Sequence, residues 1–265
     1  MKTDLSGPRL PISVCVISGA EAHRIGRTLA SIADWTSEIC VVINAEVQDG
    51  TDDIARKYGA TIFRESWKGY IAQMNSAAEK ATQPWILALD ADEVVTPDSR
   101  QEIVTLFQDQ QADLDTAYSF PRCTCFAGRW LRHGENYPDR QVRLWKKGQA
   151  KWGGVDPHYK LEVTGPVKKL RKDMLHYSNQ TINQQLSKLA SYSDLFVKHC
   201  LETNRKVGPL DLIVRPFWRF FRSYFLLRGF LDGWAGYYLA WHAAFSTATR
   251  YMKVREARRE RQGED

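Results

Sequence analysis

Short apolar runs alternate with longer segments of helical character along the first part of the chain. Residues 12–17, 38–43, 60–63 and 84–88 are expected to be strands, and residues 21–33, 51–57 and 69–81 are expected to be helices. Because the strand-like runs are almost wholly apolar, both faces of their sheet should be covered. Strands alternating with helices at this spacing predict an α/β fold, with a mostly parallel, doubly wound sheet sandwiched by helices.

The pattern becomes more irregular in the second half of the chain. Residues 118–121, 128–131 and 141–145 are expected to be short strands between loops, and residues 180–203 are expected to be a helix. From Pro209 onward, aromatic residues and arginines crowd together. The sequence therefore predicts a main domain of residues 1–207 and a helical appendage of residues 208–265.

Three acids, Asp90, Asp92 and Glu93, come directly after the last of the four apolar runs. Asp90 and Asp92 are two residues apart, so they point to the same side of an extended chain. Carboxylates at the carboxyl end of such a strand lie where open α/β sheets bind ligands, and they are the hard ligands that Mg²⁺ and Mn²⁺ prefer. The alternative is a solvated turn that enters a helix, since Thr96 and Pro97 follow.

The composition narrows the class of protein. The chain has 265 residues, of which 43% are hydrophobic and 26% charged, so we expect a globular rather than a disordered protein. Its net charge of +6 favours an anionic partner, such as a nucleotide, a nucleic acid or a membrane surface. The five cysteines form no pattern typical of secreted proteins, and the first apolar run is too short for a signal peptide, so we expect a cytoplasmic location.

The appendage has an amphipathic pattern. Arg215, Arg219 and Arg222 fall three or four residues apart and share one helical face, with aromatic residues broadly opposite. Charges, including Arg228 and Asp232, interrupt the apolar run before it reaches the roughly 20 residues that a spanning helix needs. We therefore expect the appendage to lie in a membrane interface. A helical hairpin that covers the main domain, or a homodimer contact, is the alternative.

Six segments, in this order along the chain, resemble family-2 glycosyltransferases. They are residues 41–51, 67–75, 85–93, 128–134, 137–145 and 175–178. The greatest similarity is to a small bacterial subgroup that adds glucose to the lipopolysaccharide inner core. The resemblance implies a GT-A (Rossmann-like) fold, inversion at the sugar, a UDP-sugar donor, Mg²⁺ or Mn²⁺ as cofactor, and a lipid-linked glycan acceptor.

The resemblance also implies which residues bind the donor. Residues at the ends of the first two strands would hold uracil and ribose, and residues at the start of the helix over 69–81 would contact the rest of the donor. A helix-start acid and a solvated lysine are the alternatives for two of them, Glu21 and Lys68. The residues assigned to the donor are Glu21, Asn44, Lys68, Gly69, Gln73, Asn75 and Asp90.

The same resemblance assigns the metal to Asp92, with Asp90 beside it. A metal there would stabilise the negative charge that develops on the leaving diphosphate. A carboxylate on the other side of the sugar would take the proton of the acceptor hydroxyl.

The chain departs from the family pattern at three positions. Asn44 replaces an aspartate that would accept a hydrogen bond from uracil, and Met74 replaces a basic residue. Tyr159 stands where the family has an acid directly after a histidine. If that acid is the base of the reaction, another residue must take its role, or the protein is impaired.

Three residues near that position are candidates for the catalytic group. Asp156 is the first choice for the base, with a pre-proline turn as its alternative, and Asp139 is the second. His158 would bind phosphate or pack structurally. We therefore expect a metal-dependent glycosyltransferase, peripheral on the inner face of the cytoplasmic membrane. The rival hypotheses are a catalytically impaired scaffold that binds nucleotides or glycans, and a nucleic-acid binder, which is disfavoured because no recognisable binding module is present.

Overall fold

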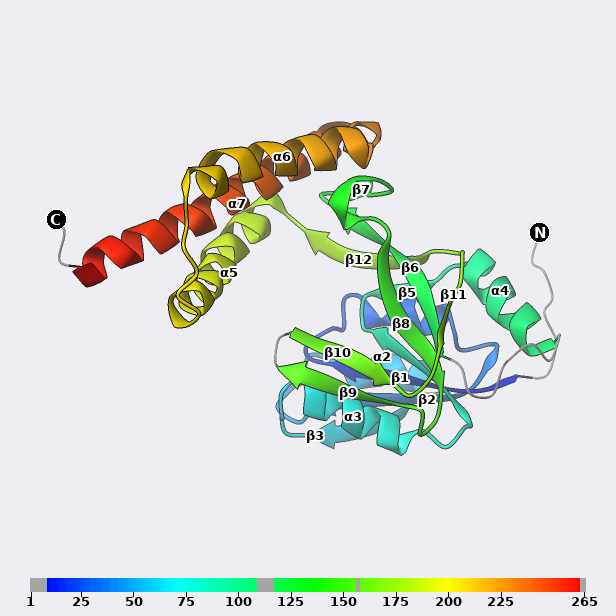
Figure 1. Ribbon diagram of the computed structural model, residues 1–265. Coiled ribbons are helices and arrows are strands. Elements are labelled where there is room, and N and C mark those ends of the chain that lie inside the picture. The colour runs from blue at the N-terminus through cyan, green and yellow to red at the C-terminus, as the bar shows by residue number, and fades with distance from the viewer. Residues whose placement is uncertain (1–8, 109–116, 156–157, 263–265) are drawn as a thin grey trace. The chain divides into compact units, whose positions relative to one another are not determined.

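The computed structural model describes residues 9–108, 117–155 and 158–262 (Figure 1). The chain divides into two compact units. The first comprises residues 1–122 and 139–177, and the second residues 123–138 and 178–265. The compact units group residues 178–207 with the appendage, while the expected catalytic domain of residues 1–207 stays a prediction.

A four-stranded parallel block forms the centre of the first unit. Its strands are β1 (Leu10–Ser18), β2 (Thr36–Asn44), β3 (Thr61–Glu65) and β4 (Trp85–Asp90). They lie in the order β3-β2-β1-β4, and every neighbouring pair is parallel. The chain thus builds outward from β1 to β3 and then crosses back to place β4 on the other side of β1. This reversal is a topological switch point, where open α/β sheets form their ligand crevice.

Antiparallel strands extend the sheet beyond β4. They are β8 (Asp139–Lys146), β6 (Ala117–Phe126), β12 (Met174–Gln180) and β5 (Glu93–Val95), in that order, with β11 (Val167–Lys169) parallel to β6. The parallel order expected from the sequence therefore holds for the first four strands, and the α/β class is confirmed.

Helices cover both faces of the parallel block. The helices α1 (Ile25–Ala30), α2 (Thr51–Lys57) and α4 (Pro97–Gln108) pack on one face through Leu29, Ala55 and Ile103. The helix α3 (Tyr70–Lys80) packs on the other face through Met74 and Ala77. Alternate residues of β1 enter the two cores, since Val14 and Val16 face the first and Cys15 faces the second. This alternation is the reason why the strand is almost wholly apolar.

The first helix is shorter than expected. The sequence predicted a helix over residues 21–33, but α1 begins only at Ile25. The preceding segment forms a loop in which the backbone N–H of Glu21 donates to the hydroxyl of Thr51 at 3.0 Å. This bond fixes the loop at the carboxyl end of β1.

A hairpin of β9 (Ala150–Val155) and β10 (His158–Val163) completes the first unit. Trp152 of β9 is buried and packs edge-on against Trp145 of β8. Asn75 of α3 joins the hairpin to the sheet, because its side chain exchanges two hydrogen bonds of 2.9 Å with the backbone of Trp152.

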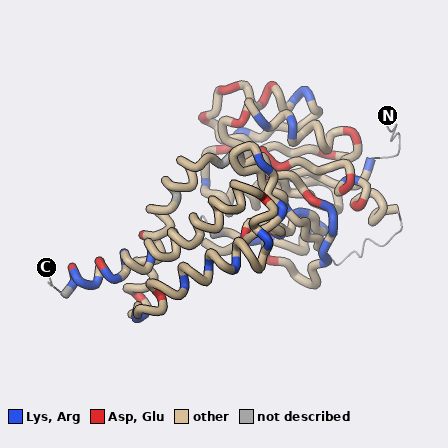
Figure 2. The backbone as a smooth tube through the Cα atoms, turned by 90° about the horizontal axis from the view of Figure 1, so that it is seen from above, with Lys and Arg blue, Asp and Glu red and all other residues tan. Residues whose placement is uncertain are grey.

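The second unit is mostly helical. Its main helices are α5 (Ile182–Glu202), α6 (Arg215–Phe221) and α7 (Gly233–Gln262), and short helical turns cover Leu210–Val214, Arg222–Leu226 and Gly229–Asp232. The helix α7 packs against both α5 and α6. Among the described residues, no helix combines the length and the apolar character needed to cross a membrane. Figure 2 shows basic and acidic residues together at the carboxyl-terminal end of α7.

Buried polar contacts hold the turns of the second unit in place. The carboxylate of Asp232 accepts hydrogen bonds from the backbone N–H groups of Arg132 and His133 at 3.0 and 2.9 Å. Gly236 lies so close to the preceding turn that a Cβ there would meet the carbonyl oxygen of Gly229 at 1.8 Å. Only glycine fits at this position.

Candidate functional site

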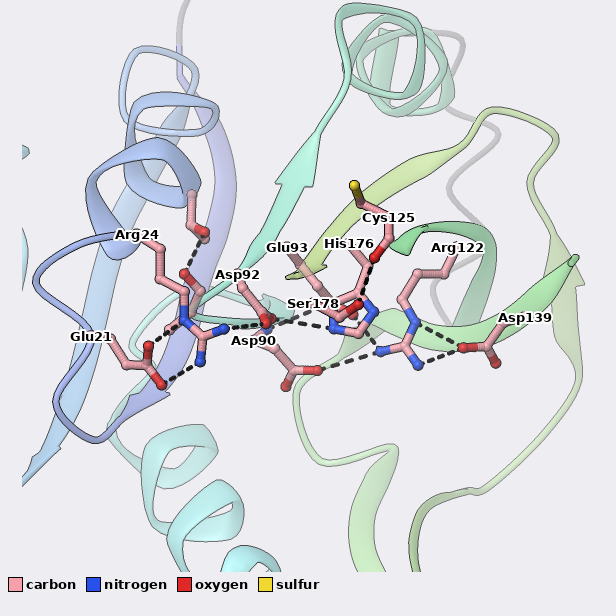
Figure 3. A network of polar contacts seen from close by, with 12 residues as sticks. Glu21, Arg24, Asp90, Asp92, Glu93, Arg122, Cys125, Asp139, His176 and Ser178 are labelled. Atoms are coloured by element: carbon pink, nitrogen blue, oxygen red, sulfur yellow. Dashed lines mark hydrogen bonds and ion pairs between the residues drawn. The ribbon is translucent and has the colours of Figure 1, made fainter. Parts of the chain in front are cut away.

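The three acids predicted from the sequence lie at the carboxyl end of β4 (Figure 3). Asp90 is the last residue of β4, Asp92 lies in the following turn, and Glu93 begins β5. Since β4 lies beside β1, this end of β4 adjoins the loop that contains Glu21 and Arg24. The acids therefore lie at the switch point of the sheet, as expected.

Two arginines from distant strands neutralise two of the acids. Arg143 of β8 donates from Nη2 to Asp90 Oδ2 and to Glu93 Oε1, both at 2.6 Å. Arg122 of β6 donates from Nη1 to Glu93 Oε1 at 2.9 Å. The other oxygen of Glu93 accepts the backbone N–H of Asp90 at 3.1 Å. These contacts give both oxygens of Glu93 a donor and make Glu93 and Arg143 an ion pair inside the protein.

The pKa values of Glu93 and Asp90 shift in opposite directions, although burial raises both. The side chain of Glu93 is only 1% exposed, and burial alone would raise its pKa, but Arg143 and Arg122 lower it to about 2. The side chain of Asp90 is 29% exposed, and the loss of surrounding water raises its pKa despite the opposing charge of Arg143. Glu93 is therefore a structural anion at neutral pH, whereas Asp90 lies at the edge of the site.

Asp92 has different partners from the other two acids. Its Oδ2 accepts a hydrogen bond from Arg24 Nη1 at 2.9 Å, and its Oδ1 lies 3.4 Å from His176 Nε2. Burial would raise the pKa of Asp92, but His176 and Arg24 together lower it. Arg24 is in turn held by Glu21, whose Oε1 accepts from Nη2 at 2.6 Å. The predicted metal ligand is therefore an anion with an arginine on one oxygen.

The acids can hold a divalent cation only when other ligands, such as phosphate oxygens and water, complete its shell. Within the described ranges, no three His, Cys, Asp or Glu side chains converge on a common point. Asp90 is bonded to Arg143 through its Oδ2, and the Oδ2 of Asp92 becomes available once Arg24 moves. Mg²⁺ is commonly held by one or two carboxylates, with phosphate oxygens and water completing its shell. The donor set thus suits a cation that arrives together with a diphosphate.

Two of the predicted donor-binding residues, Lys68 and Gln73, lie close to the carboxylate of Glu65. Lys68 pairs with Glu65 at 3.0 Å, and Gln73 is almost fully buried with its Nε2 3.5 Å from the same carboxylate. Gly69 directly precedes α3 with a φ of +88°, a conformation that favours glycine. The buried Oε1 of Gln73 has no hydrogen-bond partner within the described part of the chain. Their roles in binding the donor stay predictions.

The remaining predicted donor contacts are Asn75 and Asn44. Both polar atoms of Asn75 are used by the backbone of Trp152, which gives this side chain a structural role. Asn44 ends β2, and its Oδ1 lies 3.4 Å from the backbone N–H of Glu46, within reach of a weak local bond. The contribution of either residue to donor binding stays a prediction.

The three candidates for the catalytic group have different surroundings. Asp156 lies outside the described residues, and His158 is described only as the first residue of β10. Asp139 accepts hydrogen bonds from Arg122 Nε at 2.9 Å and from Gln141 at 2.7 Å. Both oxygens of Asp139 therefore already accept hydrogen bonds from other side chains.

Tyr159 packs where the family pattern has an acid. Its ring lies 5.6 Å from that of Tyr70 and 5.8 Å from that of Trp152. Burial, and then the negative charge of Asp90, raise the pKa of its phenol. The phenol therefore keeps its proton at neutral pH and is no substitute for a carboxylate base.

The sequence did not identify the basic side chains of the site. They reach the acids from segments far away in the chain, and their local sequences resemble those of solvated surface arginines. Arg143 offered the one available signal, a charged residue among the apolar positions of a short strand. The residues missed as site members are Arg24, Arg122, Arg143 and His176.

Comparisons with known proteins place this geometry in context. The family model described as Glycosyl transferase family 2 matches residues 13–169, which include all three acids and Arg122 and Arg143. An uncharacterized glycosyltransferase of Rickettsia felis is 27% identical over 262 residues, which cover 93% of this chain and 90% of that protein. The lipopolysaccharide core biosynthesis glycosyltransferase LpsC of Rhizobium meliloti is 25% identical over 260 residues, covering 93% and 94%. Among solved structures, S. aureus TarS 1-349 in complex with UDP-GlcNAc is similar with a TM-score of 0.48 and 14% identity, over 96% of this chain and 92% of that one.

Proposed function

This chain belongs to glycosyl transferase family 2, and on that basis we propose that it moves a sugar, glucose from UDP-glucose, onto a lipid-linked glycan at a membrane surface. One observation carries the proposal: Asp90 and Asp92 lie at the carboxyl end of β4, at the switch point of the parallel block. The name of LpsC, which is similar along nearly its whole length, favours a lipopolysaccharide core as the acceptor.

The proposed chemistry divides the work among a few side chains. When bound at Asp92, Mg²⁺ or Mn²⁺ would supply positive charge to the leaving diphosphate. Asp90 lies beside it and would orient the donor. For the proton of the acceptor hydroxyl we propose Asp156, because Asp139 is already paired with Arg122.

The second unit supports a membrane surface as the place of the reaction. Large apolar side chains are exposed along α6 and the following turn, with Phe217 74% exposed. On α7 the exposed side chains include Trp234, Tyr237, Trp241, Phe245 and Met252. Within the described part of the chain, polar atoms of Tyr238, His242, Ser246 and Arg250 are buried without a hydrogen-bond partner. Large apolar and aromatic side chains on the outside suit a helix that faces lipid headgroups and acyl chains.

The arginines of this unit have internal partners as well. Arg219 and Arg222 bond the carboxylate of Glu135 at 2.7 and 2.8 Å, and Arg215 pairs with Asp211 at 2.6 Å. Two cations share the single charge of Glu135, so a net positive charge remains on this surface. Attraction of anionic lipids is worth about 1 kcal/mol for each basic residue near the membrane.

The donor is tested by calorimetric titration of the full-length protein with UDP, ADP, GDP and dTDP, each with and without Mn²⁺. We expect binding of UDP that depends on Mn²⁺ and is lost in Asp92→Asn. Binding that is the same in Asp92→Asn would refute the metal role, and no binding of any nucleotide would refute the donor class. Asp156→Asn should still bind UDP but lose sugar transfer.

Membrane binding is tested separately by flotation with phosphatidylglycerol vesicles. We expect the wild-type protein to float and Phe217→Ser combined with Phe225→Ser to float less. Val167→Ser, which replaces an exposed apolar residue of the first unit, is the matched control and should float like the wild type. Equal flotation of all three proteins would refute the proposed lipid-facing surface.

The second candidate function is a scaffold that binds the nucleotide sugar without transferring the sugar. It is favoured by the packing of Tyr159 between Tyr70 and Trp152, where an acid is expected in the family. This function predicts UDP binding without turnover, and a gain of transfer in Tyr159→Glu. Turnover by the wild-type protein would exclude it.

A further inference from the structure

Arg24 lies between two carboxylates at the carboxyl ends of neighbouring strands. It follows β1 in the chain and directly precedes α1, whereas Asp92 follows β4. Its Nη1 donates to Asp92 at 2.9 Å, and its Nε and Nη2 both donate to Glu21. The bidentate contact of Nε and Nη2 with Glu21 orients the guanidinium, so that its third nitrogen, Nη1, points at Asp92.

The contact with Arg24 occupies the oxygen that a cation needs. Asp92 Oδ2 is bonded to Arg24, and Asp92 Oδ1 lies 3.4 Å from His176. Arg143 holds Asp90 from the interior through its Oδ2, so Asp90 lies beside Asp92 as a second carboxylate. Arg24 is 26% exposed whereas Arg143 is only 4% exposed, so Arg24 is the cation that can leave toward solvent.

We propose that Arg24 competes with the divalent cation for Asp92 and thereby makes metal binding depend on the nucleotide diphosphate. The diphosphate attracts the guanidinium away from Asp92, since phosphate oxygens accept the same forked donors as a carboxylate. The freed oxygen of Asp92 then takes the metal, which the diphosphate also binds. By linkage, the metal raises the affinity for the nucleotide by the same factor as the nucleotide raises that for the metal. This inference rests on the proposed function.

The test measures binding of Mn²⁺ alone to the full-length protein by electron paramagnetic resonance. The proteins are the wild type, Arg24→Ala and Arg27→Ala. Arg27 lies one turn further along α1 and stacks on the ring of Tyr177 at 4.0 Å, so its removal is a matched loss of one positive charge. We expect Arg24→Ala to bind Mn²⁺ about tenfold more tightly than the wild type, as the loss of one charged hydrogen bond implies, and Arg27→Ala to match the wild type. Affinity of Arg24→Ala no higher than that of the wild type overturns the proposal.

A double variant shows which carboxylate takes the metal. Removing Arg24 also frees Glu21, which could bind Mn²⁺ itself. Arg24→Ala combined with Asp92→Asn should lose the whole gain in affinity. A gain that persists in this double variant overturns the proposal, because Glu21 would then be the ligand.

Failure of the proposed function has a separate signature. If the donor is not a uridine nucleotide, UDP will not raise the affinity of the wild type for Mn²⁺, but the comparison with Mn²⁺ alone stays valid. If the donor is a uridine nucleotide and Arg24 competes with the metal, UDP raises the Mn²⁺ affinity of the wild type more than that of Arg24→Ala. An equal effect of UDP on both proteins would support the metal at Asp92 and overturn the competition by Arg24.

Discussion

Replacing Arg143 with methionine tests whether the ion pair beside the site is structural. Arg143 is 4% exposed and is the partner that Asp90 and Glu93 share, at 2.6 Å from each. Methionine keeps a long, flexible side chain and removes the charge and its donors. The variant therefore leaves two carboxylates facing one another across the space where the guanidinium lay.

The expected loss of stability follows from the burial of Glu93. Removing one partner of a buried ion pair costs about 3–5 kcal/mol, because the other charge is left without compensation. Arg122 remains 2.9 Å from Glu93 and still offsets part of its charge. We therefore expect Arg143→Met to lower the free energy of unfolding by about 3 kcal/mol, the lower end of that range.

The measurement is urea denaturation at pH 7, followed by circular dichroism. Arg140→Met is the matched control, since Arg140 lies on the same strand, is exposed and donates to the carbonyl oxygen of Leu170 at 3.0 Å. Its loss should be about 1 kcal/mol or less. Adding Glu93→Gln to Arg143→Met should restore part of the stability, because the uncompensated charge is gone. A loss in Arg143→Met no larger than that in Arg140→Met would refute the reasoning.

Three further predictions concern acid, the hairpin and the second unit. Arg143 and Arg122 lower the pKa of Glu93 from 4.5 to about 2 despite its burial, so Glu93 stabilises the fold above pH 4.5 and loses this contribution as the pH falls toward 2. Unfolding midpoints measured over this pH range should therefore fall less steeply in Glu93→Gln than in the wild type. Equal slopes for the two proteins would contradict the assignment. Asn75→Ala removes both bonds to Trp152 and should cost about 2 kcal/mol, with faster amide exchange in β9; unchanged exchange would show that the pair does not hold the hairpin. Thr181→Ala removes the side-chain cap of α5 and should cost about 1 kcal/mol in thermal unfolding, whereas Thr203→Ala at the other end of the helix should cost less.

The sequence predicted the elements of the parallel block because each of them has a local signal. The runs over 12–17 and 38–43 became β1 and β2 with a few residues added at their ends, and the predicted helix over 51–57 has the observed bounds of α2. A strand covered on both faces is apolar at every position, which a short window of sequence reveals. The helix over 21–33 was predicted too long at both ends, since α1 covers only Ile25–Ala30, and the segment before it is held as a loop by the distant Thr51.

The partners of the acids could not be predicted in the same way. Asp90 and Arg143 are 53 residues apart, and Asp92 and Arg24 are 68 residues apart. No local pattern shows which of many arginines the fold will bring to an acid. The same limit applies to the packing of α5 on α7, which joins distant segments of the chain.

The acidic motif divides into a structural part and an exchangeable part. Glu93, 1% exposed, and Asp90 are bonded to Arg143 from the interior, and removing that arginine would leave charges that the protein cannot easily solvate. Asp92 is held instead by Arg24, which is more exposed to solvent and also pairs with Glu21, so that it can stay bound to Glu21 when it leaves Asp92. A cation that is to be replaced by substrate must be held weakly and lie near solvent, whereas one that fixes the fold must be buried. The different exposures of Arg24 and Arg143 therefore support the proposal that the contact of Arg24 with Asp92 opens during the reaction, whereas Arg143 fixes the strand that carries the acids.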